Sequence, residues 1–133
     1  RVCMKTVCEV LKNKNKNQNI THIESNISAH EAMQLMANKK IGALVVVEQG
    51  KMVGIISERD YPNRAKTKCK PLLGVLVKDI MSKHVVHVTP NDSIERCIEL
   101  IARNHVRHLP VLENEEILGI ISIGDLSKIK SAA

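Results

Sequence analysis

Apolar residues recur at helical spacing in two segments of the chain, 28–40 and 93–104. Positions three and four apart share one face of a helix, so each segment predicts an amphipathic helix. Ser28 and Glu31 form a capping-box pattern, which places the start of the first helix just after Ser28. The apolar faces consist of Ala29, Ala32, Met33 and Met36 in the first segment and Ile94, Cys97, Ile98, Ile101 and Ala102 in the second.

Runs rich in Val, Ile and Leu flank each helix and predict strands. Segments 19–23 and 84–88 each predict a short strand before the helix, and segments 43–57 and 108–122 each predict a hairpin after it. Pro110 has no N–H to donate, so its strand is expected to stay unpaired on that side. A further helix is expected after each hairpin, and the order of elements is therefore β-α-β-β-α twice.

The motif G-I-I-S-x-x-D occurs twice, and its two copies begin at Gly54 and Gly119, an offset of 65 positions (119 minus 54). The same offset aligns 20–60 with 85–125 without a gap. A match of this length predicts an internal duplication. Identical pairs include His22 with His87, Asn26 with Asn91, Ser28 with Ser93, Leu44 with Leu109 and Val46 with Val111.

Short apolar segments at 6–11 and 77–81 predict a lead-in helix before each half. We divide the chain into a first repeat with its lead-in helix at 5–66, a linker at 67–75 and a second repeat at 76–130. Because a half of about 60 residues buries little surface alone, the two sheets are expected to pack face to face around a pseudo-two-fold axis. The predicted fold class is α+β.

Composition narrows the classes of partner. The chain has 133 residues, 44% of them hydrophobic, and Tyr61 is the only aromatic side chain, so the core is expected to be aliphatic. The net charge is +6, which favours anionic partners such as a phosphate ligand, nucleic acid or a membrane surface. No apolar run approaches the roughly 20 residues of a membrane-spanning helix. The basic groups are Arg1, Lys5, Lys12, Lys14 and Lys16, and Arg59, Arg64, Lys66, Lys68 and Lys70.

The four cysteines are Cys3, Cys8, Cys69 and Cys97, and none of them forms C-x-x-C. No secretory signal precedes them, so we expect reduced thiols in a reducing compartment. We expect a cytoplasmic protein. An organelle stays open as a second interpretation, because the chain begins on Arg1 and targeting information is expected to have been trimmed.

The doubled motif has a structural and a functional interpretation. In the structural one, Ser57 with Asp60 and Ser122 with Asp125 only cap helices, because S-x-x-D between a strand and a helix is a capping pattern, and the glycines only ease a turn. In the functional one, N–H groups at a helix start attract phosphate, the serine hydroxyl donates to it, and the aspartate accepts from ribose hydroxyls. Two copies in a symmetric fold then predict two related nucleotide clefts.

The residues between each first helix and its hairpin extend the functional interpretation. Segment 41–43 (Ile-Gly-Ala) has small side chains that let a flat base approach the backbone. The equivalent segment 106–108 (Val-Arg-His) offers the planar donors of Arg107 to phosphate and a donor near neutral pH from His108. The alternative is a solvated surface arginine and a hydrogen-bonded strand histidine.

Together, “GIISERD”, “VRHLPV” and “GIISIGD” resemble the motifs of paired cystathionine β-synthase (CBS) domains, the arrangement called a Bateman module. The resemblance covers residues 6 to 129 and is strongest to standalone CBS pairs. It implies binding of an adenosine-containing ligand (AMP, ADP, ATP, NAD or S-adenosylmethionine) in the cleft between repeats. It also implies a homodimer of pairs that forms a flat disk.

Carried over residue by residue, the resemblance implies a role for each matching position. It implies adenine near Ile41, Gly42 and Ala43, ribose on Asp125 or Asp60, and phosphate near Ser122, Ser57, Arg107, His108 and Arg59. The “VRHLPV” motif adds Val106 and Pro110 to the site. The chain departs from the pattern at Pro62 and Asn63, where relatives continue a helix. We therefore expect the Ser122/Asp125 cleft to be the better site.

Three other functions fit the sequence less well. An enzyme is disfavoured because no G-x-S-x-G, H-E-x-x-H or P-loop motif occurs and Cys69 has no evident base. Nucleic-acid binding is disfavoured because the chain has one aromatic residue for stacking and no recognition motif. A zinc site needs three or four converging ligands, and no cysteine pair supports the candidate histidines. Those histidines are His84, His87, His105 and His108.

The sequence therefore predicts a regulatory, non-catalytic module that senses an adenosine-containing ligand and has no obligatory cofactor, metal or membrane partner. Positive charge favours AMP, ATP or NAD over the cationic S-adenosylmethionine. A regulated protein partner is expected, but the residues do not name it. The alternative is a ligand-free interaction scaffold in which the repeat motifs are only structural.

Overall fold

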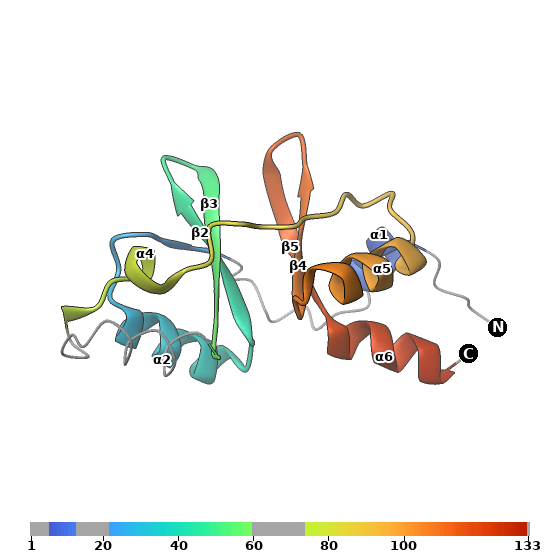
Figure 1. The fold of residues 1–133 in the computed structure, drawn as a ribbon, viewed down its shortest axis with the longest axis horizontal. Helices are drawn as coiled ribbons and strands as arrows, with labels where there is room; N and C mark the ends of the chain where they lie inside the picture. Colours follow the sequence, from blue (N-terminus) through green and yellow to red (C-terminus); the bar gives the residue numbers. More distant parts are fainter. Residues whose placement is uncertain (1–5, 13–21, 60–73, 133) are drawn as a thin grey trace. The chain divides into compact units, whose positions relative to one another are not determined.

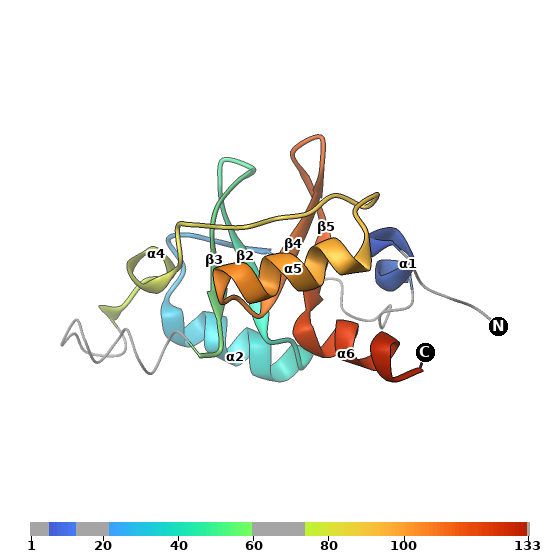
Figure 2. The same cartoon turned by 45° about the vertical axis from the view of Figure 1, so that its right-hand side comes forward.

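The computed structural model describes residues 6–12, 22–59 and 74–132 (Figures 1 and 2). Contacts divide the chain into two compact units. One, here called the continuous unit, comprises residues 18–85. The other, the split unit, combines residues 1–17 with 86–133. Among the described residues, no helix is long and apolar enough to cross a membrane.

The continuous unit is a three-stranded sheet with helices packed on it. The sheet contains β1 (His22–Glu24), β2 (Ala43–Glu48) and β3 (Lys51–Ser57) in the order β1-β2-β3. Strand β1 is parallel to β2, and β2 is antiparallel to β3. Helices α2 (Ala29–Lys39) and α4 (Val77–Ile80) contact each other, and α4 contacts β3.

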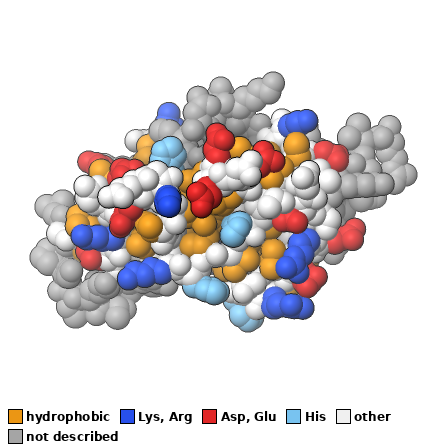
Figure 3. All heavy atoms as spheres, turned by 90° about the horizontal axis from the view of Figure 1, so that it is seen from above, with side chains coloured by type: hydrophobic (Ala, Val, Ile, Leu, Met, Phe, Trp, Pro, Cys, Tyr) orange, Lys and Arg blue, Asp and Glu red, His pale blue; other side chains and the backbone are white. Residues whose placement is uncertain are grey.

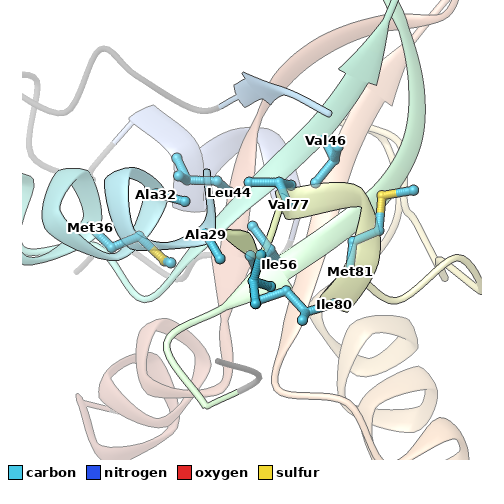
Figure 4. Packing of buried hydrophobic residues seen from close by; sticks show 10 residues of the cluster. Ala29, Ala32, Met36, Leu44, Val46, Ile56, Val77, Ile80 and Met81 are labelled. Carbon is cyan, nitrogen blue, oxygen red and sulfur yellow. The ribbon is translucent and has the colours of Figure 1, made fainter. Parts of the chain in front are cut away.

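Figure 4 shows how the two helices and the sheet of this unit share one core. The predicted apolar face of α2 is confirmed, because Ala29, Ala32 and Met36 are buried and Met33 packs against the cluster. Ser28 caps α2 as predicted, since its Oγ accepts the Glu31 N–H at 3.1 Å. The buried cluster consists of Ala29, Ala32, Met36, Leu44, Val46, Ile56, Val75, Val77, Ile80 and Met81.

The split unit is built on the hairpin of β4 (His108–Glu113) and β5 (Glu116–Ser122), with α1 (Val7–Lys12), α5 (Ile94–Asn104) and α6 (Ile123–Ala132) around it. Its buried cluster consists of Val7, Val10, Val88, Cys97, Ile101, Leu109, Val111, Ile121 and Leu126.

The predicted apolar face of α5 is wider than the face that the helix buries. Cys97 and Ile101 are buried and Ile94 is partly buried. Ile98 is 38% exposed, and Ala102 is also exposed. Ile98 and Ala102 thus belong to the predicted face but lie outside the part of it that this unit buries.

Both hairpins close with the same two-residue turn. Gln49 and Gly50 have φ of 52° and 78°, and Asn114 and Glu115 have φ of 52° and 69°. Two successive residues with positive φ define a type I′ turn, whose twist matches that of the flanking strands. In each hairpin the register shifts at one point, next to Gly54 in the first and at the equivalent place in the second. The two hairpins therefore share the same turn type and the same position of the register shift.

The predicted strand at 84–88 is reduced to one parallel bridge, between Val88 and Val111. At this bridge the Val88 N–H donates to Pro110 O at 3.0 Å and the Leu112 N–H donates to Val88 O at 2.9 Å. In a parallel ladder the next bonds would come from the N–H groups at positions 90 and 110, and both are prolines. Two missing donors therefore explain why the second half has no counterpart of β1.

The two lead-in helices are exchanged between the repeats. Helix α4, which precedes the second repeat in sequence, packs in the continuous unit, and α1 packs in the split unit. The Val77 N–H donates to Ile27 O at 2.8 Å, and the Lys78 N–H donates to Ser25 O at 3.0 Å. The equivalent bonds in the split unit are Val7 N–H to Asp92 O (3.0 Å) and Cys8 N–H to Pro90 O (2.9 Å).

The compact units in space thus differ from the segments that the repeat defines along the sequence. The boundaries at 5–66, 67–75 and 76–130 describe the duplication, and as such they stay a prediction. Each lead-in helix completes the unit built around the other repeat.

Candidate functional site

The residues of the first half-site gather at one end of the β2–β3 hairpin. Helix α2 is followed by the C-cap residue Lys40, whose left-handed conformation (φ 56°) turns the chain toward the strand. The Gly42 carbonyl then accepts the Glu58 N–H at 3.1 Å, and Ala43 is paired with Ser57. This bond joins the residue before β2 to the residue after β3. The described members of the first half-site are Ile41, Gly42, Ala43, Ser57 and Arg59.

The second half-site repeats this arrangement at the end of the β4–β5 hairpin. Helix α5 is followed by the C-cap residue His105, which is also left-handed (φ 55°). The Arg107 carbonyl accepts the Ile123 N–H at 2.9 Å, and His108 is paired with Ser122. Pro110 lies two residues further along β4 and is buried. The members of the second half-site are Val106, Arg107, His108, Pro110, Ser122 and Asp125.

The two half-sites differ in their chemistry. In the first, Ile41 is partly buried against the core, and Arg59 is exposed. In the second, Val106 takes the place of Ile41 in packing, and Arg107 is exposed. Positions 42 and 43 carry no donor side chain, whereas Arg107 and His108 carry donors at the equivalent positions.

Ser122 and Asp125 cap the start of α6 reciprocally. The Asp125 N–H donates to Ser122 Oγ at 3.1 Å, and the Ser122 N–H donates to Asp125 Oδ2 at 2.9 Å. These two bonds form a complete capping box, so the predicted capping by Ser122 and Asp125 is confirmed. The ligand role of Asp125 stays a prediction.

At the first copy, Ser57 Oγ accepts the Arg59 N–H at 3.3 Å. Asp60 lies outside the described residues, as do Pro62 and Asn63. The predicted displacement of the following helix therefore stays a prediction. So does the preference for the Ser122/Asp125 cleft.

The glycine of each motif has a role that the sequence interpretation missed. Gly54 and Gly119 lie within strands β3 and β5, where a lead-in helix crosses them. A Cβ on Gly54 would lie 2.7 Å from both Met81 Sδ and Ser82 O, and one on Gly119 would lie 2.9 Å from Leu11 Cδ2. The idea that these glycines ease a turn was wrong. An isolated glycine in an apolar strand was the available signal, since it indicates close approach of another segment.

Among the described residues, Cys8 is partly exposed, Cys97 is buried, and neither forms a disulfide. The predicted reducing compartment stays a prediction. Burial raises the pKa of the Cys97 thiol to about 11, and the nearby Asp92 carboxylate adds to the shift. The thiol is therefore protonated near neutral pH. Cys3 and Cys69 lie outside the described residues.

Charges of both signs are mixed on the described surface, as the face in Figure 3 shows. Of the two predicted basic groups, only Lys12 and Arg59 belong to the described residues. No cluster of three or more His, Cys, Asp or Glu side chains that could hold a metal ion occurs in the part of the chain that the structure describes.

Comparison with known proteins identifies the family to which this chain belongs. The model of the CBS domain matches the chain twice, at residues 14–61 and 77–131. The chain belongs to the CBS domain family. Its fold is the α+β fold of a CBS pair, and the recognition and fold class predicted from the repeated motifs are confirmed.

Two relatives show the extent of the match. The chain is 31% identical over 128 residues to the mitochondrial CBS domain-containing protein CBSX3 of Arabidopsis thaliana, covering 91% of this chain and 62% of that protein. The chain thus spans less than two thirds of CBSX3. A solved protein with CBS domains from Burkholderia ambifaria MC40-6 is 38% identical, with a TM-score of 0.89 over 96% of this chain and 94% of that one.

A second solved structure has the same fold with lower identity. The CBS domain pair of protein MJ0100 superimposes with a TM-score of 0.83 over 97% of this chain and 98% of that one, at 22% identity. That pair was solved in complex with 5′-methylthioadenosine and S-adenosyl-L-methionine.

Proposed function

We propose that this CBS pair is a regulatory, non-catalytic module that binds an adenosine-containing ligand, with AMP, ADP, ATP and NAD as the candidates. The observation that carries the proposal is the doubled junction between hairpin and helix. Glu58 N–H to Gly42 O and Ile123 N–H to Arg107 O fix each half-site in the same way. The adenosyl ligands bound to the MJ0100 pair support the ligand class.

The chemistry of the second half-site favours a ligand with phosphate. The exposed Arg107 presents guanidinium N–H donors suited to phosphate oxygens. The start of α6 adds the positive end of a ten-residue helix. The Asp125 carboxylate, at the start of the same helix, is the acceptor that we assign to ribose hydroxyls.

The test is calorimetric titration of nucleotide-stripped protein with AMP, ATP, NAD and S-adenosylmethionine. The decisive variant is Asp125→Asn. Asp125 is the third residue of α6, and an asparagine there keeps an oxygen that can accept the Ser122 N–H, but it lacks the charge and one acceptor. We expect Asp125→Asn to weaken ligand binding at least about tenfold, as for the loss of a hydrogen bond to a charged group, with little change in melting temperature.

Ser93 provides a matched control for the capping serine. Its Oγ accepts the Arg96 N–H at 3.0 Å, a bond like that of Ser122. Ser93→Ala and Ser122→Ala should each destabilise the fold by about 1 kcal/mol. Only Ser122→Ala should also weaken ligand binding.

The outcomes separate the two candidate functions. Saturable binding that Asp125→Asn weakens supports the sensor. Binding that Asp125→Asn leaves unchanged would show that the residue assignment is wrong. If none of the four ligands binds, the motifs are capping devices, and the interaction scaffold becomes the function. The predicted homodimer is a separate proposal, which sedimentation equilibrium of the full chain would test.

A further inference from the structure

We propose that α1 is a releasable strap on the split unit. When docked, it closes the core of that unit. When released, it opens the core to solvent around Cys97, while the continuous unit stays folded. This inference does not depend on the proposed ligand.

Helix α1 is held by its first turn and by its apolar face. The N–H groups of Val7 and Cys8 donate to carbonyl groups just before α5, at 3.0 and 2.9 Å. Val7 and Val10 are 0% and 3% exposed and belong to the same buried cluster as Cys97. Figures 1 and 2 both show α1, in blue, against the beginning of α5. Release of α1 would therefore uncover this core.

The seat of α1 on β5 depends on Gly119. A Cβ there would lie 2.9 Å from Leu11 Cδ2 and would have no other atom within 4 Å. The contact is therefore with the end of a flexible side chain. In the continuous unit, a Cβ on Gly54 would also lie 2.7 Å from the Ser82 carbonyl oxygen, which cannot rotate away. A methyl group on Gly119 can therefore be accommodated if the Leu11 side chain moves away, which loosens α1 on β5, whereas the backbone at Gly54 cannot give way.

The connectivity of the chain also favours release of α1. Helix α4 is part of an unbroken segment, 18–85, that makes up its whole unit, whereas that entire segment separates α1 from the rest of the split unit. Docking of α1 therefore closes a long loop, which costs entropy. A free helix of six residues is not stable in water. Such an element opens locally, at a lower free energy than the whole protein.

The experiment uses Cys97 in the full chain as a reporter. Cys3, Cys8 and Cys69 are replaced with serine, and labelling of Cys97 by a disulfide reagent at pH 8 is followed in increasing urea. We expect a labelling rate that does not change at low urea, because local opening exposes little surface. Gly119→Ala should raise this rate about threefold, because the end of the Leu11 side chain must leave its place on β5.

Two matched variants isolate the contact. Leu11→Ala alone should also raise the labelling rate, and in that background Gly119→Ala should add nothing, because the clashing methyl group is gone. Gly74→Ala is the neutral control, since a Cβ there meets no atom within 4 Å. Hydrogen exchange of β2 and β3 should be unchanged in all of these variants.

Two results would overturn the proposal. One is a labelling rate for Cys97 that follows global unfolding at every urea concentration. The other is an effect of Gly119→Ala that is as large with Ala as with Leu at position 11. If Gly119→Ala does not fold, two measurements still test the proposal. They are the urea dependence of Cys97 labelling in the reporter chain and the change in labelling rate caused by Leu11→Ala.

Discussion

The Cys97 side chain shows how burial sets chemistry at the scale of one residue. It is fully buried, and its pKa is raised from 9.0 to about 11. The unfolded chain releases this proton above about pH 9, and the folded protein retains it until about pH 11. The folded state therefore binds more protons between these values, and its stability must fall as pH rises through that window.

We predict that the free energy of unfolding declines between pH 9 and pH 10.5 more steeply in the wild-type protein than in Cys97→Ala. The difference should reach on the order of 2 kcal/mol. Urea titrations at several pH values measure it, and groups common to both proteins cancel. Parallel curves for the two proteins would show that the thiol does not titrate in this way.

Residue-level chemistry could be predicted only in part from the sequence. The capping pattern of Ser122 and Asp125 predicted the two bonds observed, because capping depends on neighbours along the chain. The left-handed residues Lys40 and His105 were not foreseen. They are neither glycine nor asparagine, so no local signal marked the turn that aims each half-site.

At the scale of elements, two prolines determine the width of the second sheet. In the continuous unit, Ser25 N–H donates to Val47 O at 3.2 Å and continues the pairing of β1 with β2. Pro90 occupies the equivalent position and cannot donate. Pro110 likewise replaces Val45, which is paired with His22. The prediction that Pro110 leaves its side unpaired holds except for the bridge at Val88.

Pro110→Val should therefore restore a backbone donor and lengthen the pairing. We expect the new amide at position 110 to be protected from hydrogen exchange at least about tenfold. Overall stability should change by less than about 1 kcal/mol, because proline also restricts the unfolded chain. The reciprocal variant, Val45→Pro, removes a donor from the central strand β2 and should destabilise the fold by about 1–3 kcal/mol. An unprotected amide at position 110 would contradict this account of the missing strand.

The packing partners of the two lead-in helices could not be predicted from the sequence. The existence of these helices could be predicted from apolar spacing. Leu11 and Met81 take equivalent places against Gly119 and Gly54, yet they are 70 positions apart (81 minus 11), whereas the repeat has an offset of 65. An alignment at one fixed offset therefore cannot pair them. Which unit a helix completes depends on tertiary packing.

At the scale of the whole molecule, the excess of positive charge should influence ligand choice. The net charge of +6 raises the local concentration of anions, and added salt screens this attraction. We predict that raising the salt concentration from about 0.05 to 0.5 M weakens ATP binding at least about threefold, because the added ions screen the attraction between the protein and the phosphates. Binding of the phosphate-free 5′-methylthioadenosine should change little. Equal salt dependence in calorimetric titrations would contradict a role for phosphate.

The division into a continuous and a split unit also has a consequence for synthesis of the protein. Residues 18–85 leave the ribosome as one uninterrupted segment that holds every part of its unit. Val7 and Val10 leave earlier, but their partners in β4, β5 and α6 are made last. The chain is thus expected to complete the continuous unit first during translation. Helix α1 then remains without its core until nearly the whole chain has been made.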